Sequence, residues 1–196
     1  MSPDPISIGT RVYVEAVQFS DAKGSKKFPA STGPTEPQRT IFGYTKREDY
    51  TDSQRHIWRP GTEFVTRIGA GKDSVAECWW TQPVAERITG TADPELYRYG
   101  VHAPEFWANL TVGPGKYSVR LCFAATRGID TRRNCFDIFI NGRRVVERLD
   151  VAATAGGPNR AADLVFTGIA PSHGIIEVRL KAAKSLDGEL VRGEAF

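Results

Sequence analysis

The strongest constraint on the fold is a two-residue alternation in residues 106–124, FWANLTVGPGKYSVRLCFA. One face of the run before the GPG carries Phe106, Ala108, Leu110 and Val112. One face of the run after it carries Tyr117, Val119, Leu121 and Phe123. Such alternation sets one face of a strand on a core. Glycine and proline between the runs allow a tight reversal. We therefore predict a two-stranded hairpin that serves as scaffold.

From Ile57 onward the chain is a succession of short apolar runs separated by turn residues. The other candidate strands are residues 11–19, 63–68, 76–80, 95–101, 135–140, 144–151, 162–169 and 174–180. Asn141 and Gly142 lie between two of them, and Asn-Gly favours a type I′ two-residue hairpin. Many short strands, 19 glycines, 12 prolines and no convincing amphipathic helix predict an all-β protein, a β-sandwich with a jelly-roll or immunoglobulin-like layout.

The first part of the chain differs in composition from the rest. Residues 21–40, DAKGSKKFPASTGPTEPQRT, have no periodicity and are rich in Lys, Gly, Ser, Thr and Pro, as in loops and linkers. We therefore expect an N-terminal strand and linker-like extension over residues 1–48 and a β-sandwich domain over residues 49–196.

Charge and hydropathy exclude several partners. The net charge of +3 arises from 26 basic and 23 acidic side chains, a near balance that gives no electrostatic case for nucleic acid or a membrane surface. No apolar run is long enough to span a bilayer, and the first residues lack a signal-peptide pattern. The localisation is therefore not indicated, although a periplasmic or secreted parent protein is compatible with this chain.

The three cysteines predict neither a disulfide framework nor a metal site. Cys78, Cys122 and Cys135 are odd in number and lack metal-ligand spacing. We expect buried thiols, with a bridge between Cys122 and Cys135 as the alternative if their strands are neighbours.

The sequence offers no catalytic constellation. His56, His102 and His173 lie in different segments, and the chain contains no nucleophile elbow, zinc-protease motif or phosphate-binding glycine loop. Aspartates are numerous enough for a glycosidase pair, but no spacing selects one. We therefore expect no enzymatic activity from this chain.

Aromatic residues before the GPG give the clearer functional signal. The rings that lie near the ends of predicted strands in this part of the chain are Trp58, Trp79, Trp80, Tyr97, Tyr99, Phe106 and Trp107. Flat rings near strand ends can stack on the apolar face of a sugar. Trp79 and Trp80 are consecutive, so in a strand they face opposite sides and at most one fills the core. Core packing is the alternative role for each ring.

Three motifs together resemble the malectin family, also classified as carbohydrate-binding module family 57. They are DPELYRYG, then GKYSVRLCFA, then CFDIFINGRRVVERLD, and YTDSQRHIW at residues 50–58 resembles an earlier family segment. The resemblance covers residues 45–196. It implies a jelly-roll β-sandwich that binds an oligosaccharide or polysaccharide in a pocket formed by loops at one end.

The resemblance also implies site residues. Tyr99 or His102 holds the place of a family tyrosine, and Glu194 lies nearest to a family aspartate. Thr126 and Arg127 stand where the family has an aromatic pair. If the pocket lies there, Arg127 and Asp130 form a wall suited to an acidic or hydroxyl-rich sugar. The candidate sugar-binding residues are Tyr97, Tyr99, His102, Trp79, Trp80, Arg127, Asp130 and Glu194.

The chain is most similar to malectin-like modules attached to bacterial family 2 glycoside hydrolases. This implies noncatalytic carbohydrate binding by an accessory domain covalently linked to a hydrolase. The alternative is a structural module that packs on a neighbouring catalytic domain through an outer face bearing Trp107 or Trp80. No cofactor is expected, and a structural calcium ion is left open.

Overall fold

The computed structural model describes residues 8–17, 37–44, 46, 48–61, 87–100, 105–126 and 135–183. For residues 8–17 and 105 it describes the backbone alone. The elements in chain order are β1 (Ile8–Val17), β2 (Gln38–Ile41), β3 (Tyr50–Thr51), β4 (Ile57–Pro60), the 3-10 helix η3 (Pro94–Tyr97), β5 (Glu105–Thr111), β6 (Lys116–Ala125), β7 (Phe136–Ile140), β8 (Arg143–Leu149), α1 (Val151–Ala155), β9 (Ala161–Ile169) and β10 (Ile175–Ala182).

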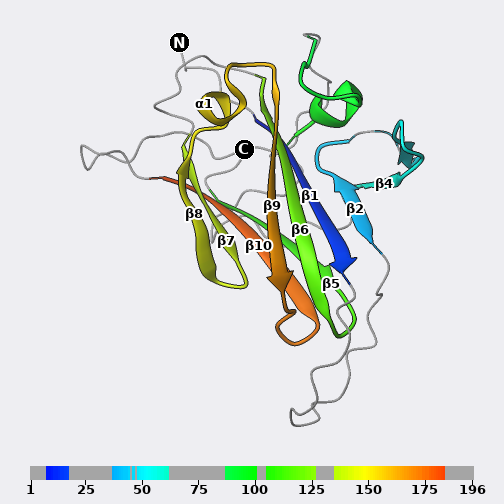
Figure 1. The fold of residues 1–196 in the computed structure, drawn as a ribbon, viewed down its shortest axis with the longest axis vertical. Coiled ribbons are helices and arrows are strands. Elements are labelled where there is room, and N and C mark those ends of the chain that lie inside the picture. Colours follow the sequence, from blue (N-terminus) through cyan, green and yellow to red (C-terminus); the bar gives the residue numbers. More distant parts are fainter. Residues whose placement is uncertain are drawn as a thin grey trace, which may run out of the picture.

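These strands form two facing sheets, as Figure 1 shows. A six-stranded sheet has the order β3-β4-β2-β1-β6-β9, and a four-stranded sheet has the order β5-β10-β7-β8. All pairings are antiparallel except β2 with β4. The expected all-β sandwich is confirmed.

The GPG turn connects the two sheets, so the predicted hairpin is wrong. β5 pairs with β10, whereas β6 pairs with β1 and β9. The cause is that both runs carry an apolar face. Leu110 of β5 and Leu121 of β6 both pack in the core between the sheets. Two such faces bury most area when they oppose each other across a sandwich, rather than lying side by side in one sheet.

The Asn-Gly turn is confirmed. β7 and β8 are joined by Asn141 and Gly142, whose φ angles of 49° and 76° are those of a type I′ turn. The Asn141 side chain also donates to the carbonyl of Ala170 and accepts from the N–H of Glu177. The turn is therefore tied to the neighbouring strand as well as closing its own hairpin.

Two other predictions need correction. Residues 95–101 were expected to form a strand, but η3 lies at their start because Pro94 fixes a helical φ at its first position. The short helix α1 was not expected. Its N-terminus is capped by Asp150, whose carboxylate accepts from the N–H of Ala153 at 2.9 Å, and Gly156 ends it with a φ of 76°. The expected strands at 63–68 and 76–80 lie outside the described residues.

The segment before residue 48 contributes two strands to the larger sheet. β1 pairs with β6 along its ten residues, and β2 pairs with both β1 and β4. The division into two parts at residue 48 stays a prediction.

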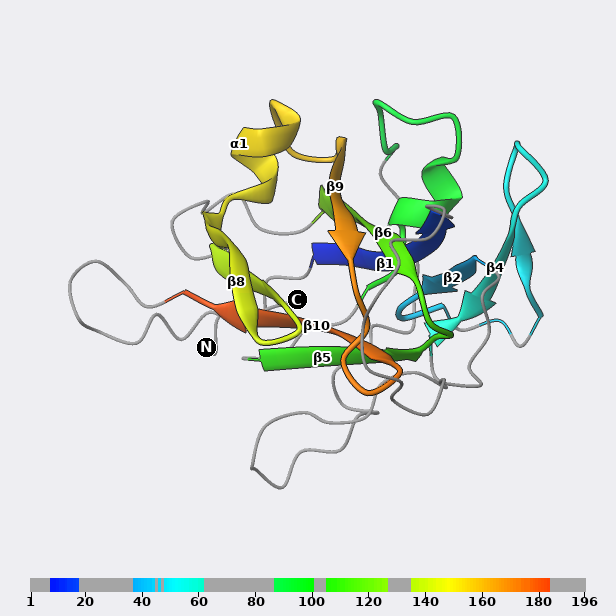
Figure 2. The same cartoon turned by 60° about the horizontal axis from the view of Figure 1, so that its bottom comes forward.

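Two apolar clusters hold the fold together. The main cluster lies between the sheets and contains Phe106, Phe123, Phe136 and Leu180. The second cluster lies on the other face of the six-stranded sheet, where Tyr97 and Trp58 pack with Cys122 and Ala124 of β6. The helix η3 therefore covers part of the outer face of that sheet, near its edge strands β3 and β4 (Figure 2).

Cys122 and Cys135 form no disulfide with each other. Cys122 is buried, as expected, and Cys135 is partly buried. Burial, with a smaller contribution from the charge of Asp150, raises the pKa of the Cys135 thiol. Cys78 lies outside the described residues. Within the described part of the chain, no helix has the length and apolarity to cross a membrane.

A close backbone approach at Gly43 gives a test of this packing. Gly43 has a φ of 77°, and a Cβ there would overlap the backbone of Gly100. Gly142 has a φ of 76° but open space around it. Gly142→Ala should therefore cost about 1–2 kcal/mol of unfolding free energy, from backbone strain alone.

Gly43→Ala carries the same strain and a backbone overlap besides, so it should cost at least about 2 kcal/mol more than Gly142→Ala. Urea unfolding of the two variants and wild type measures the difference. Equal losses would show that residues 43 and 100 are not in contact.

Candidate functional site

A polar pocket of about 350 Å³ opens on the outer face of the six-stranded sheet. The residues that line it are Arg39, Asp52, Gln54, His56, Trp58, Thr91, Ala92, Asp93, Leu96, Tyr97, Arg120, Cys122 and Asp163. On β6, Arg120 and Cys122 alternate with Val119 and Leu121 of the main core, so they face away from the other sheet. We call this site the polar pocket.

Asp52 organises one wall of the polar pocket. Its side chain is 6% exposed. It accepts hydrogen bonds from the backbone N–H groups of Gln54 and His56 at 2.9 and 2.8 Å. It also contacts Nδ1 of His56 at 3.1 Å and accepts from Nε1 of Trp58 at 2.9 Å. This carboxylate thus fixes the turn after β3 and orients the imidazole and indole rings.

The environment of Asp52 favours its ionised form. Burial opposes ionisation, but hydrogen bonds from Trp58 and His56 outweigh it, and the pKa of Asp52 lies below its ordinary value. Protonation would weaken the N–H hydrogen bonds that this carboxylate accepts, because one of its oxygens would then carry a proton. Asp52 is therefore charged at neutral pH, and its charge stabilises the wall.

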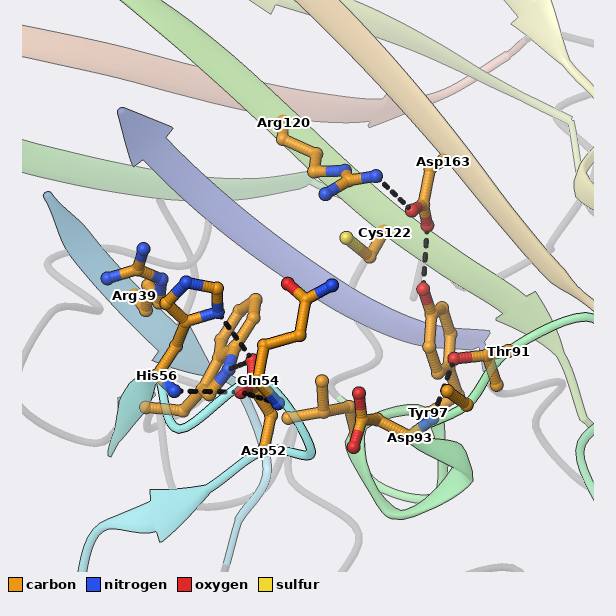
Figure 3. Close-up of a pocket in the computed structure, with 13 residues that line it drawn as sticks. Arg39, Asp52, Gln54, His56, Thr91, Asp93, Tyr97, Arg120, Cys122 and Asp163 are labelled. Atoms are coloured by element: carbon orange, nitrogen blue, oxygen red, sulfur yellow. Dashed lines mark hydrogen bonds and ion pairs between the residues drawn. The ribbon is translucent and has the colours of Figure 1, made fainter. Parts of the chain in front are cut away.

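The opposite wall is formed by a chain of three side chains from η3, β9 and β6. The Tyr97 hydroxyl donates to Oδ1 of Asp163 at 2.7 Å, and Arg120 lies 3.2 Å from Oδ2 of the same carboxylate. Figure 3 shows these groups across the pocket from Gln54 and His56. Tyr97 and Asp163 are 66 residues apart in sequence, so only folding brings them together.

Asp93 joins the two loops at the rim. Its carboxylate accepts from the backbone N–H of Ser53 at 2.7 Å and from the Ser53 hydroxyl at 2.8 Å. Its own N–H donates to the Thr91 hydroxyl at 3.0 Å. These bonds link the β3–β4 turn to the start of η3, so the rim is preorganised.

The lining suits a polyhydroxylated ligand. All three carboxylates already accept hydrogen bonds from protein groups, and guanidinium, amide and imidazole groups stand beside them. The indole of Trp58 and the ring of Tyr97 complete the walls. Small-ligand sites of about 300–1,000 Å³ typically combine ring surface with a few oriented polar groups. Among the described residues, no three His, Cys, Asp or Glu side chains cluster as metal ligands.

Two of the eight predicted sugar-binding residues lie in the described part of the chain. Tyr97 is buried but lines the polar pocket. Tyr99 is 2% exposed and donates to Oε1 of Glu95 at 2.8 Å. Burial and the neighbouring Glu95 raise the pKa of the Tyr99 phenol. Its ring packs edge-to-face on the ring of Tyr44, with 4.9 Å between the two ring centroids.

The other six predicted site residues stay predictions, because Trp79, Trp80, His102, Arg127, Asp130 and Glu194 lie outside the described residues. Sequence reasoning did not select the polar pocket. One local signal was available: in YTDSQRHIW, an aspartate precedes a histidine and a tryptophan by four and six residues. Such an aspartate can accept backbone N–H groups and fold the turn onto itself. No local signal relates Asp52 to Asp163.

An all-β sandwich whose rim loops form a pocket of oriented polar groups is the architecture of a ligand-binding module. The malectin domain model matches residues 24–191, beginning before residue 45, where the motifs begin. The chain therefore belongs to the malectin domain family. This is a carbohydrate-binding family whose members are typically noncatalytic binding modules.

Solved structures share the fold. The ANXUR2 extracellular domain from Arabidopsis thaliana has a TM-score of 0.59 and 15% identity, over 80% of this chain and 38% of that one. The ANX2 ectodomain from the same plant has a TM-score of 0.57 and 15% identity, with the same coverage. Bacteroides uniformis beta-glucuronidase has a TM-score of 0.51 and 23% identity, over 70% and 15% of the two chains. The chain thus spans less than half of each. No curated protein matches it.

The wall built on Asp52 gives a prediction about acid stability. The pKa of Asp52 is lowered by folding, so its stabilising charge is fully present above the ordinary aspartate value near 4 and is lost as pH falls through the lower folded value. Asp52→Asn should lower the unfolding free energy at pH 7 by about 1–3 kcal/mol, because an amide cannot accept all of these bonds.

The unfolding free energy of this variant should also fall less steeply below about pH 4 than that of wild type. Asp49→Asn, an identical change at an exposed position, is the control and should cost less than about 0.5 kcal/mol. Chemical unfolding across pH measures both. Parallel pH profiles for wild type and Asp52→Asn would refute this role of Asp52.

Proposed function

We propose that this chain binds an oligosaccharide or polysaccharide, without catalysis, through the polar pocket. The observation that carries the proposal is the set of fixed side chains around one cavity: Asp52 orients His56 and Trp58, and Asp163 orients Arg120 and Tyr97. A sugar presents hydroxyl groups that both donate and accept, so it matches a lining of carboxylates, an amide and guanidinium groups.

Membership of the malectin domain family supports a saccharide over other polar ligands. We further propose that the chain is an accessory module of a larger glycoside hydrolase. The shared fold with part of a bacterial beta-glucuronidase chain supports this setting. An accessory module needs only weak affinity, because covalent linkage keeps it close to the surface that it binds.

The predicted loop residues extend this proposal. Arg127 and Asp130, between β6 and β7 in sequence, and His102, after η3, follow elements that line the polar pocket. If they contribute, one saccharide contacts both the loops and the pocket. Tyr99 is less suited to a mutational test, because its ring is buried and its removal would leave a cavity.

Glycan-array binding of the purified chain, followed by calorimetry on the best neutral saccharide, tests the proposal. We expect a Kd between about micromolar and millimolar. Gln54→Ala and Arg120→Ala should each weaken binding about three- to tenfold, because each removes hydrogen bonds worth about 0.5–1.5 kcal/mol.

Lys116→Ala is the matched control for Arg120→Ala, since both residues are exposed on β6 but Lys116 does not line the polar pocket. The affinity of the Lys116→Ala variant for the saccharide should stay within about twofold of that of wild type. Arg127→Ala tests the loop. Binding that depends on Arg127 but not on Gln54 or Arg120 would place the site in the loop and overturn the polar-pocket assignment. Silence across the array, from folded protein, would refute carbohydrate binding.

A further inference from the structure

A second cavity lies on the outer face of the four-stranded sheet. Figure 2 shows β5 and β10 of this sheet on the other side of β1 and β6 from η3. It measures about 330 Å³ and is lined by Asp137, Phe139, Arg144, Glu147, Arg148, Arg179, Lys181, Ala182 and Ala183. We call it the cationic groove. Four of its side chains are basic and two are acidic, so its lining carries an excess of two positive charges.

A cross-strand row of alternating rings and guanidinium groups runs through this face. Arg179 of β10 is in register with Trp107 of β5 on one side and Phe139 of β7 on the other. Phe139 is in turn paired with Arg144 of β8. Paired residues in a sheet point to the same face. Because Ile138 faces the core between the sheets, this row faces outward.

The rings hold Arg179 in place. Its guanidinium carbon lies 4.4 Å from the Phe139 ring centroid and 6.0 Å from that of Trp107. A guanidinium that lies over a ring can still donate in its own plane to a bidentate acceptor such as a carboxylate. The partly buried Trp107 ring, which was considered above as part of an apolar docking patch, is thus associated with a cation.

An irregular edge strand brings further charges to the groove. Phe136 pairs with Leu149 and Ile138 with Val146, so Glu147 and Arg148 together stand opposite Asp137 alone. Such a bulge changes the direction of the side chains on that strand. Arg148 has a φ of 50°, which is uncommon for a residue other than glycine. Its N–H donates to Oδ1 of Asp137 at 2.8 Å, which fixes this backbone.

The two carboxylates serve to position a cation. Arg144 lies 3.4 Å from Oδ2 of Asp137 and 3.1 Å from Oε1 of Glu147. Since Asp137 also accepts from the Arg148 backbone, its oxygens are engaged within the protein. The groove therefore offers the positioned guanidinium groups of Arg144 and Arg179 beside ring surface, and Lys181 belongs to the same lining.

From this geometry we propose that the cationic groove is a second binding site, specific for an acidic saccharide whose carboxylate or sulfate groups bind Arg144, Arg179 and Lys181. A cavity of this size suits one or two sugar rings, whose C–H faces can lie on the aromatic surface. The excess positive charge selects the anionic sugar over its neutral counterpart. This site is separate from the polar pocket and does not depend on it.

Titration calorimetry at low salt tests the groove with four probes of equal length: an oligogalacturonate, a sulfated oligogalactan, a neutral oligogalactan and an oligoglutamate. At least one charged saccharide should bind saturably and more tightly than the neutral one. Arg144→Gln and Lys181→Gln should each weaken that binding about fivefold or more, because each removes a charge-assisted hydrogen bond.

Arg143→Gln is the control, because it removes the same charge from the same strand, and Arg143 does not line the groove. The affinity of the Arg143→Gln variant for the charged saccharide should stay within about twofold of that of wild type. The charged saccharide that binds more tightly identifies the anionic group. Tighter binding of oligoglutamate would overturn the proposal in favour of an acidic protein partner. Equal weakening by Arg143→Gln, or no binding of either charged saccharide, would also overturn it. Neutral-glycan binding through the polar pocket is measured separately with Arg120→Ala.

Discussion

Burial of strand β6 on both of its faces is the constraint on which this structure depends. Its residues Tyr117, Val119, Leu121 and Phe123 fill the core between the sheets, and Cys122 and Ala124 anchor the second cluster beneath the rim loops. A strand covered on both sides leaves little room for a charge. Arg120, on the outer face of β6, is exposed. The polar pocket opens at this side chain, between β9, η3 and the turn that Asp52 holds.

The two cavities on the opposite faces of the sandwich differ in how they use charge. In the polar pocket, the carboxylates of Asp52 and Asp163 are fixed by donors from distant segments, and cations and anions are mixed. In the cationic groove, the acids Asp137 and Glu147 hold Arg144 and the basic side chains are in excess. The first arrangement suits hydroxyl groups of either polarity, and the second suits anionic oxygens.

Much of the architecture could be read from local patterns, because strand periodicity and turn chemistry act over a few residues. The Asn141-Gly142 turn and most strands after residue 105 were predicted correctly. Two errors have different origins, one in tertiary context and one in a local residue. The GPG turn was predicted to close a hairpin, yet it joins two sheets, because burial of two apolar faces against each other outweighs pairing between sequence neighbours. Residues 95–101 have strand-forming residues, but Pro94 begins a helical turn there.

The sequence by itself determined the fold class and, through its combined motifs, the malectin family, since these depend on periodicity, turns and local residue patterns. Only the tertiary structure decided which polar, charged and aromatic side chains contact one another. Tyr97 reaches Asp163, Ser53 reaches Asp93, and Trp107, Arg179 and Phe139 form one row because strands distant in sequence are paired. Strand order and register determine these contacts. Strand order and register in turn result from the burial of all apolar faces at the same time, and no local pattern specifies that arrangement.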